Sequence, residues 1–168
     1  MARDPDLAAD LARYGPRPFR RKWSAYAVRV YRFGRRVQAR RPGPVRNGLM
    51  KIYWLRFRLI ELLTGISLPV GAQIGPGLLI HHFGNIFIDE KVKIGRNCTL
   101  RQGVTIGNRH PDGGVPVIED DVEFGAYAQV LGAVRIGRGA RIGAMSVVLC
   151  DVPPGATAVG IPARIITH

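Results

Sequence analysis

The sequence predicts an all-β body with an α-helical N-terminus: a parallel β-helix of about five coils in residues 69–168, preceded by two amphipathic or apolar helices in residues 1–68. Three observations support this fold class. A six-residue repeat runs through the second part of the chain, glycine makes up 21 of 168 residues, and charge is unevenly spread. Residues 1–68 contain 16 Lys or Arg and four acidic residues, whereas residues 69–168 contain nine Lys or Arg and eight acidic residues. This asymmetry indicates a basic attachment region on a nearly neutral body.

The first helix is expected in residues 21–40, where apolar and basic side chains separate onto two faces. One face carries Trp23, Tyr26, Ala27, Val30, Phe33 and Val37, and the other carries Arg21, Lys22, Arg29, Arg32 and Arg36. Residues 49–66 are apolar almost all round and predict the second helix, which Gly65 and Pro69 end. The first 18 or so residues are expected to be loosely ordered.

Two hypotheses for the basic region stay open. In one, the helices cap the open end of the β-helix, whose unpaired edge needs cover. In the other, residues 20–66 attach the protein to an anionic membrane surface. Four charges between Leu49 and Ile66 argue against a membrane-spanning helix, and no base-reading motif supports nucleic acid as a partner. The two distant cysteines, Cys98 and Cys150, favour the cytoplasm, with the inner face of the cytoplasmic membrane as the surface for attachment.

The repeat begins at Val70 and returns to an aliphatic or aromatic residue at most steps of six. The series contains Val70, Ile88, Ile94, Leu100, Ile106, Ile118, Phe124, Val130, Ile136, Ile142 and Val148, with Pro76, His82 and Pro154 at the other steps. An α-helix cannot place every sixth residue on one face, whereas short strands joined by tight turns can. Three hexads form one triangular coil of 18 residues, and we expect this register to hold without a slip to about residue 160.

Two places depart from the repeat. Residues 107–117 (GNRHPDGGVPV) have no inward aliphatic residue at the expected steps and predict a loop extruded from the β-helix. Loops on rigid scaffolds often carry function. His82 stands at a step where an aliphatic residue is expected, and it directly follows His81. The loop and the His pair are therefore the candidate functional segments.

The repeat and the closing segment IGAMSVVLCDVPPGATAVGIPARII resemble the hexapeptide-repeat acyltransferases, whose fold is a left-handed parallel β-helix. The resemblance covers residues 70–166 and rests on the repeat register, the VPPG segment and the G-x-P-A-R turn. Within this family, GVTIGNRH and the His in IHHFGN are similar to the serine acetyltransferases. The His-His pair and the short basic N-terminal region are more similar still to the colanic-acid-type O-acetyltransferases of exopolysaccharide clusters.

The resemblance implies transfer of an acetyl group from acetyl-CoA to a hydroxyl, in a homotrimer whose active sites lie between subunits. His82 matches the family's catalytic base, and a neutral imidazole suits that task near pH 7. His81, Arg109 and His110 are expected to bind the acceptor, and no metal is expected. The residues expected to bind the cofactor are Gly107, Asn108, Gly125, Ala126, Ala128, Arg141, Gly143, Ala144 and Arg164.

We expect the acceptor to be a sugar hydroxyl of a surface polysaccharide or its lipid-linked precursor. His81 stands where serine acetyltransferases have an Asp that handles the serine amino group, and Arg109-His110 lie early in the loop rather than before its final Pro. The first alternative is serine O-acetylation in cysteine biosynthesis. Two others use the same fold: a zinc-dependent carbonic anhydrase, which requires three well-spaced His ligands, and a non-catalytic scaffold that binds membranes.

Overall fold

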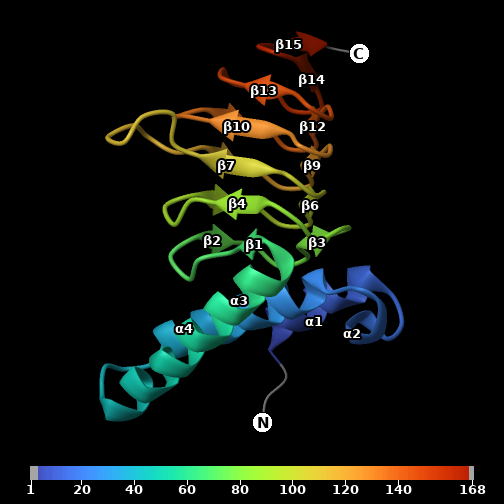
Figure 1. Cartoon of the computed structure of the whole chain (residues 1–168). Helices are drawn as coiled ribbons and strands as arrows, with labels where there is room; N and C mark the ends of the chain where they lie inside the picture. Colours follow the sequence, from blue (N-terminus) through green and yellow to red (C-terminus); the bar gives the residue numbers. More distant parts are fainter. Residues whose placement is uncertain (1–3, 167–168) are drawn as a thin grey trace.

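The computed structural model describes residues 4–166, which form a helical base and a three-sided β-helix that rises from it (Figure 1). The base contains α1 (Pro5–Tyr14), α2 (Pro18–Arg21), α3 (Ser24–Gln38) and α4 (Pro44–Thr64). The lower β-helix contains β1 (Ile66–Ser67), β2 (Gln73–Ile74), β3 (Leu79–Ile80), β4 (Ile86–Ile88), β5 (Lys93–Ile94), β6 (Thr99–Leu100) and β7 (Thr105–Gly107). The upper part contains β8 (Val117–Ile118), β9 (Glu123–Phe124), β10 (Gln129–Leu131), β11 (Arg135–Ile136), β12 (Arg141–Ile142), β13 (Val147–Val148), β14 (Thr157–Gly160) and β15 (Ala163–Ile166).

The strands stack into three sheets, one for each side of the coil. We call them sheet A (β1, β4, β7, β10, β13), sheet B (β2, β5, β8, β11) and sheet C (β3, β6, β9, β12, β14, β15). Equivalent residues of successive coils pair in parallel, as Ile88 with Ile106 in sheet A and Ile118 with Ile136 in sheet B. The last pair is antiparallel, because β14 and β15 form a hairpin. The predicted parallel β-helix of about five coils is thereby confirmed.

The core consists of columns in which one residue of each strand stacks on its equivalent in the next coil. In sheet C the buried column contains Ile80, Leu100, Phe124, Ile142 and Ala158. A second buried column, at the corner between sheets B and C, contains Cys98, Val122, Ala140 and Ala156. Burial raises the pKa of Cys98 to about 11, so this thiol stays protonated and acts as a core side chain.

The prediction of an unbroken repeat was wrong, because the register slips at two places in the described residues. The later slip lies after β13, where Ile142 pairs with Ala158 only 16 positions further on instead of 18. The earlier slip moves His82. Below this slip the inward residues are Ile74 and Ile80, and the next inward residue is Ile88, eight positions later. The pairing shows the same change, since Ile80 pairs with Leu100 whereas Ile88 pairs with Ile106. The two extra residues lie in the turn between β3 and β4. His82 therefore does not point into the core at a step of the repeat but lies exposed in this turn.

The corner between sheets C and A places a residue with left-handed backbone at the same position of each coil. Gly103, Tyr127 and Met145 have φ values of 72°, 59° and 60°. A Cβ on Gly103 would lie 2.2 Å from the Tyr127 ring, so glycine is required at this level of the stack. The amides of Gly103, Tyr127 and Met145 donate to the coil below, at the carbonyl oxygens of Gly84, Gln102 and Ala126.

The helical base differs from the prediction at its start. α1 and α2 occupy the segment that we expected to be loosely ordered, so the base has four helices rather than two. Asp4 caps α1 by accepting hydrogen bonds from the amides of Asp6 and Leu7 at 3.1 and 3.2 Å, and Pro5 begins its first turn. The β-helix begins at β1, which pairs with β4, and so starts three residues before the predicted boundary at residue 69.

A buried ion pair joins α1 and α3 to the first coil. Arg32 Nε donates to Asp10 Oδ2 at 2.7 Å, and the other Arg32 nitrogens donate to the carbonyl oxygens of Ile74 and Gly75. Asp10 Oδ1 accepts hydrogen bonds from the amides of Gly77 and Leu78, both at 2.8 Å. These backbone groups have no earlier coil to pair with, and the base supplies their partners. The arrangement supports the capping hypothesis for the N-terminal helices.

α3 and α4 pack as a helical hairpin beside this cap. Gly34 permits the close approach, because a Cβ at this position would lie 2.5 Å from the Tyr53 ring. Tyr53 and Phe57 bury one face of α4 against α3 and Val70. α4 begins at Pro44, five residues before the predicted start, and ends at Thr64 before Gly65, whose φ of 64° stops the helix. Among residues 4–166, every helix is too short or too polar to cross a membrane.

Candidate active site

His81 and His82 lie in the first coil, at the corner where sheet C turns into sheet A. The His81 amide continues the sheet C ladder by donating to the Leu100 carbonyl oxygen at 3.0 Å. The two imidazole centroids are 6.4 Å apart. His82 is exposed, and within residues 4–166 no hydrogen bond engages its imidazole. This ring is therefore available to accept a proton from an incoming hydroxyl.

A groove of about 440 Å³ runs from this corner along the outer face of sheet C. Its walls come from strands β3, β6, β9 and β12, from the turns that follow them and from α1. The lining residues are Arg13, Leu79, His81, Thr99, Arg101, Glu123, Phe124, Gly125, Arg141, Ile142, Gly143 and Ala144. The structure thus brings four residues predicted to bind the cofactor together with His81: Gly125, Arg141, Gly143 and Ala144.

Positive charge dominates this groove. Arg13, Arg101 and Arg141 contribute three cations against the single carboxylate of Glu123. Arg13 is held in place by hydrogen bonds to the carbonyl oxygens of Gly77 and Asn97, both at 2.6 Å. Partial burial, followed by the charges of Arg101 and Lys22, lowers the pKa of His81 below its usual value. His81 is therefore neutral near pH 7, and the groove suits a ligand with phosphate groups.

The segment between β7 and β8 extends away from the β-helix, as the yellow loop of Figure 1 shows. Residues 109–114 of this loop are exposed. The loop leaves sheet A at the end of β7, whereas His82 lies before the start of the neighbouring strand β4. One protomer therefore places His82 near the amino ends of the sheet A strands and the loop residues Arg109 and His110 near their carboxyl ends.

The remaining predicted cofactor residues lie outside the groove. Gly107 and Asn108 are at the loop edge of sheet A, and the Asn108 amide group donates to the Pro111 carbonyl oxygen at 3.4 Å. Ala126 and Ala128 lie at the corner between sheets C and A, two coils above His82. The Ala128 side chain is fully buried in the core. Arg164 is exposed on β15, in the terminal hairpin.

Three further residues that were not predicted from the sequence also line the groove: Arg13, Thr99 and Arg101. Arg13 comes from α1, and no spacing in the sequence connects this helix to sheet C. The repeat could have identified Arg101, because this residue directly follows the inward residue Leu100. The equivalent positions in three other coils of sheet C are His81, Gly125 and Gly143, so this part of the column forms the edge of the groove.

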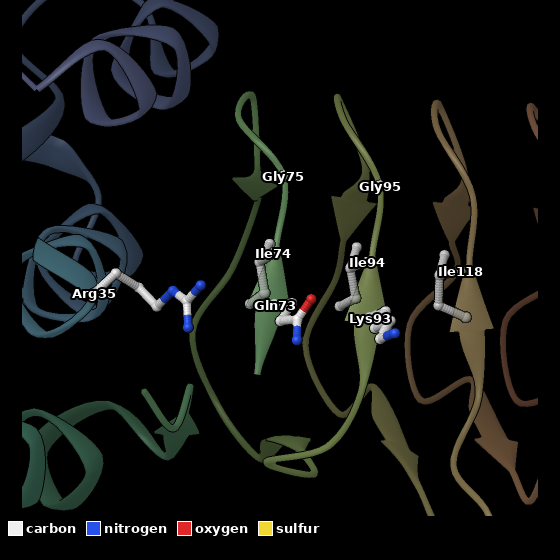
Figure 2. A pocket seen from close by; sticks show the side chains of 8 residues that line it. All are labelled: Arg35, Gln73, Ile74, Gly75, Lys93, Ile94, Gly95 and Ile118. Atoms are coloured by element: carbon white, nitrogen blue, oxygen red, sulfur yellow. The ribbon is translucent and has the colours of Figure 1, made fainter. Parts of the chain in front are cut away.

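A second hollow, of about 330 Å³, lies on the outer face of sheet B opposite α3. Figure 2 shows Arg35 reaching from α3 toward Gln73, with Lys93 on the neighbouring strand. The Arg35 guanidinium already donates to the Val70 carbonyl oxygen at 3.2 Å. This hollow has no carboxylate, imidazole, hydroxyl or thiol among its lining residues and contains none of the predicted site residues. The groove on sheet C is therefore the better candidate for chemistry.

Metal-ligating side chains do not gather in the part of the chain that the structure describes. Within residues 4–166, no group of three or more His, Cys, Asp or Glu could hold a metal ion. His110 is on the extruded loop, across sheet A from His81 and His82. A single copy of the chain therefore does not form the three-His site that the carbonic anhydrase alternative requires.

Comparison with known proteins identifies what this arrangement is similar to. Residues 116–150 match the family described as bacterial transferase hexapeptide (six repeats). A serine acetyltransferase of Bacillus licheniformis is 45% identical over 113 residues, which cover 66% of this chain and 52% of that protein. The structure of soybean serine acetyltransferase complexed with serine has a TM-score of 0.81 at 31% identity, and the match covers 97% of this chain and 70% of that one. A serine acetyltransferase complex with CoA has a TM-score of 0.80 at 27% identity, with coverage of 96% and 68%.

These comparisons overturn the expectation of a sugar acceptor and of a closer relationship to colanic-acid-type acetyltransferases. The relative and the two structures described above are serine acetyltransferases, so serine, the alternative acceptor, is better supported. The expectation was wrong because it relied on the basic N-terminal region and on two local departures, at His81 and in the position of Arg109-His110. Similarity over more than a hundred residues outweighs them. This chain spans about half the length of the curated relatives that it matches.

Proposed function

Because this chain belongs to the hexapeptide-repeat acyltransferases, we propose that it transfers an acetyl group from acetyl-CoA to the hydroxyl of serine. The observation that carries the proposal is the exposed His82 imidazole, which has no internal hydrogen bond among the described residues and lies beside the cationic groove of sheet C. The similarity to serine acetyltransferases, including complexes with serine and with CoA, supports the two substrates.

In this reaction His82 is the general base. Its imidazole takes the proton of the serine hydroxyl while the oxygen attacks the carbonyl carbon of the thioester. The new C–O bond forms, the C–S bond breaks, and the proton passes from the imidazolium to the CoA thiolate. The step needs no covalent enzyme intermediate, because the acceptor attacks the thioester directly. General-base assistance of this kind contributes roughly 10²–10⁴-fold to the rate.

The groove on sheet C suits the donor. Arg101 and Arg141 are exposed on its wall and supply positive charge for the phosphates of CoA. Gly125 and Gly143 follow the inward residues of β9 and β12 and present backbone without side chains at the same edge. An acetyl-CoA molecule extended along this edge would place its thioester at the corner where His82 lies, next to the proposed base.

We further propose that the active form is a homotrimer with its sites between subunits. A single copy holds His82 and the pair Arg109-His110 at opposite ends of the sheet A strands. The loop of a neighbouring copy can reach the His82 corner in an assembly with closed rotational symmetry. In this arrangement Arg109 and His110 of the adjacent subunit contact the acceptor, and His82 takes its proton.

The test is thiol release from acetyl-CoA in the presence of L-serine, with the acetylated product identified by mass. We expect turnover by the wild type and a loss of about 10²–10⁴-fold in kcat for His82→Ala, because the base is removed. Lys93→Ala, which truncates an exposed side chain on sheet B, should keep the wild-type rate. Absence of serine turnover in the wild type, or an undiminished rate in His82→Ala, contradicts the proposal.

A further inference from the structure

The outward face of α4 carries a continuous apolar stripe that no described part of the chain covers. Tyr53 and Phe57 face α3, whereas the stripe lies on the opposite side of the helix. Leu55 and Leu62 are 73% and 83% exposed. The stripe contains Val45, Ile52, Leu55, Leu59, Leu62 and Leu63, which are all exposed and recur at helical spacing. In Figure 1 the α3–α4 hairpin projects sideways from the base.

Basic side chains flank the stripe along both sides. On a helical wheel Lys51 and Arg58 border one side, and Arg56 borders the other. All three are exposed. Residues 11–60 contain 15 Lys or Arg and no acid, so the surrounding surface is cationic as well. Arg32 and Arg35 of this segment are committed to the cap on the first coil, whereas the basic residues bordering the stripe make no contact with the β-helix among the described residues.

We propose that this face of α4 docks on the surface of a bilayer that contains anionic lipid. Leucine and isoleucine side chains enter the boundary between headgroups and acyl chains, while the flanking basic residues pair with anionic headgroups. α4 lies in the plane of the surface and does not cross the bilayer, which agrees with the absence of a spanning helix among residues 4–166. The proposal is independent of the acceptor and of the chemistry at His82.

A second copy of the chain is a poorer occupant of this face. Two stripes packed against each other would bring Lys51, Arg56 and Arg58 of one copy close to the same cations of the other. The only acid on α4, Glu61, is already paired with Arg58 at 2.9 Å. The charge around the stripe therefore complements an anionic surface and repels a copy of itself.

The test is co-sedimentation of the full chain with vesicles of phosphatidylcholine, with and without phosphatidylglycerol, at low and at high salt. We expect binding only to the vesicles with phosphatidylglycerol and release at high salt. Leu55→Gln with Leu62→Gln should weaken binding at least tenfold, and Lys51→Gln with Arg58→Gln should weaken it about fivefold for each charge removed. Ile161→Gln, an exposed apolar residue in the hairpin at the far end of the β-helix, is the matched control and should bind as the wild type does.

Circular dichroism and acetyl-CoA turnover of each variant establish that the fold is retained. The proposal is overturned if the wild type does not bind vesicles with phosphatidylglycerol, or if the double leucine variant binds them as well as the wild type. It is also overturned if sedimentation velocity without vesicles shows that the double leucine variant has a smaller assembly than the wild type. In that outcome the stripe is an interface between copies of the chain.

Discussion

At the scale of the residue, two neighbouring histidines have different environments. His81 ends the ladder of strand β3 and faces the groove, where burial and the charges of Arg101 and Lys22 disfavour its protonated form. His82 is one residue further into the turn, exposed to solvent. The extra two residues in this turn separate the roles, because they remove His82 from the core column that the repeat alone would assign to it.

The position of His81 predicts a pH dependence of stability. In the unfolded chain His81 takes up a proton near its ordinary pKa of about 6.5, whereas in the fold it resists protonation to a lower pH. The unfolded state therefore binds more protons just below this pH, and the free energy of unfolding falls as pH is lowered through it. Urea unfolding at about pH 7.5 and about pH 5.5 measures this. His81→Asn should lose this part of the decrease, and Arg101→Gln should reduce it. An identical decrease in all three proteins contradicts the assignment.

At the scale of the element, α1 is the least expected part of the molecule. The helix is short, and an isolated helix of this length would be marginally stable in water. In the fold, polar side chains of α1 form hydrogen bonds with backbone groups of the first coil. Asp10 is fully buried and accepts hydrogen bonds from Arg32, Gly77 and Leu78. Arg13 reaches three carbonyl oxygens of the first two coils and the Thr99 hydroxyl. α1 is thus both a cap for the β-helix and one wall of the groove.

The cap predicts a large difference between two aspartates of α1. Asp10→Ala leaves the buried Arg32 charge without its carboxylate and two backbone amides without acceptors, so we expect a loss of about 3–5 kcal/mol in the free energy of unfolding. Asp6→Ala removes a carboxylate that is half exposed and 3.7 Å from Arg32, so the loss should be below about 1 kcal/mol. Urea unfolding of both variants checks this. Equal losses would mean that the buried pair does not hold the cap.

At the scale of the whole molecule, the β-helix works as a rigid rod that separates functional groups. The His82 corner lies at one end of the sheet A strands and the extruded loop lies at the other end. The strands between them are paired in register. Core columns run through all coils, so this separation cannot close by local bending. The loop of a second copy of the chain would have to reach the His82 corner, which is the physical basis for the proposed trimer.

Mixing two inactive variants tests this arrangement. His82→Ala keeps the loop, and Arg109→Ala with His110→Ala keeps the base, so each protein alone should be nearly inactive. Unfolded together in equal amounts and refolded, they should recover about a quarter of the wild-type turnover. A site is intact only when His82 comes from the loop variant and the loop comes from the His82→Ala variant, which random mixing gives at about one site in four. The same variants refolded apart are the control. Absence of recovery in the mixture contradicts a site shared between subunits.

The repeat in the sequence is sufficient to predict the β-helix and most of its core. A six-residue alternation of inward residues can be buried only by stacked coils, and glycine, asparagine and aspartate at the corners permit the turns. The sequence also identified the His pair, the segment that forms the extruded loop and four of the residues that share the groove. These features depend on residues that are close in sequence or repeat at a fixed period, and both kinds of signal are visible in a single chain.

The place of the earlier register slip, the folding of α1 and the residues that complete the groove could not be predicted from the sequence. The slip in the turn after β3 is visible only in the pairing of β3 with β6 and of β4 with β7. α1 is ordered by contacts such as Asp10 with Leu78 and Arg13 with Thr99, which join residues more than sixty positions apart. No local pattern encodes such contacts, because the energy that orders the helix comes from partners that folding brings to it.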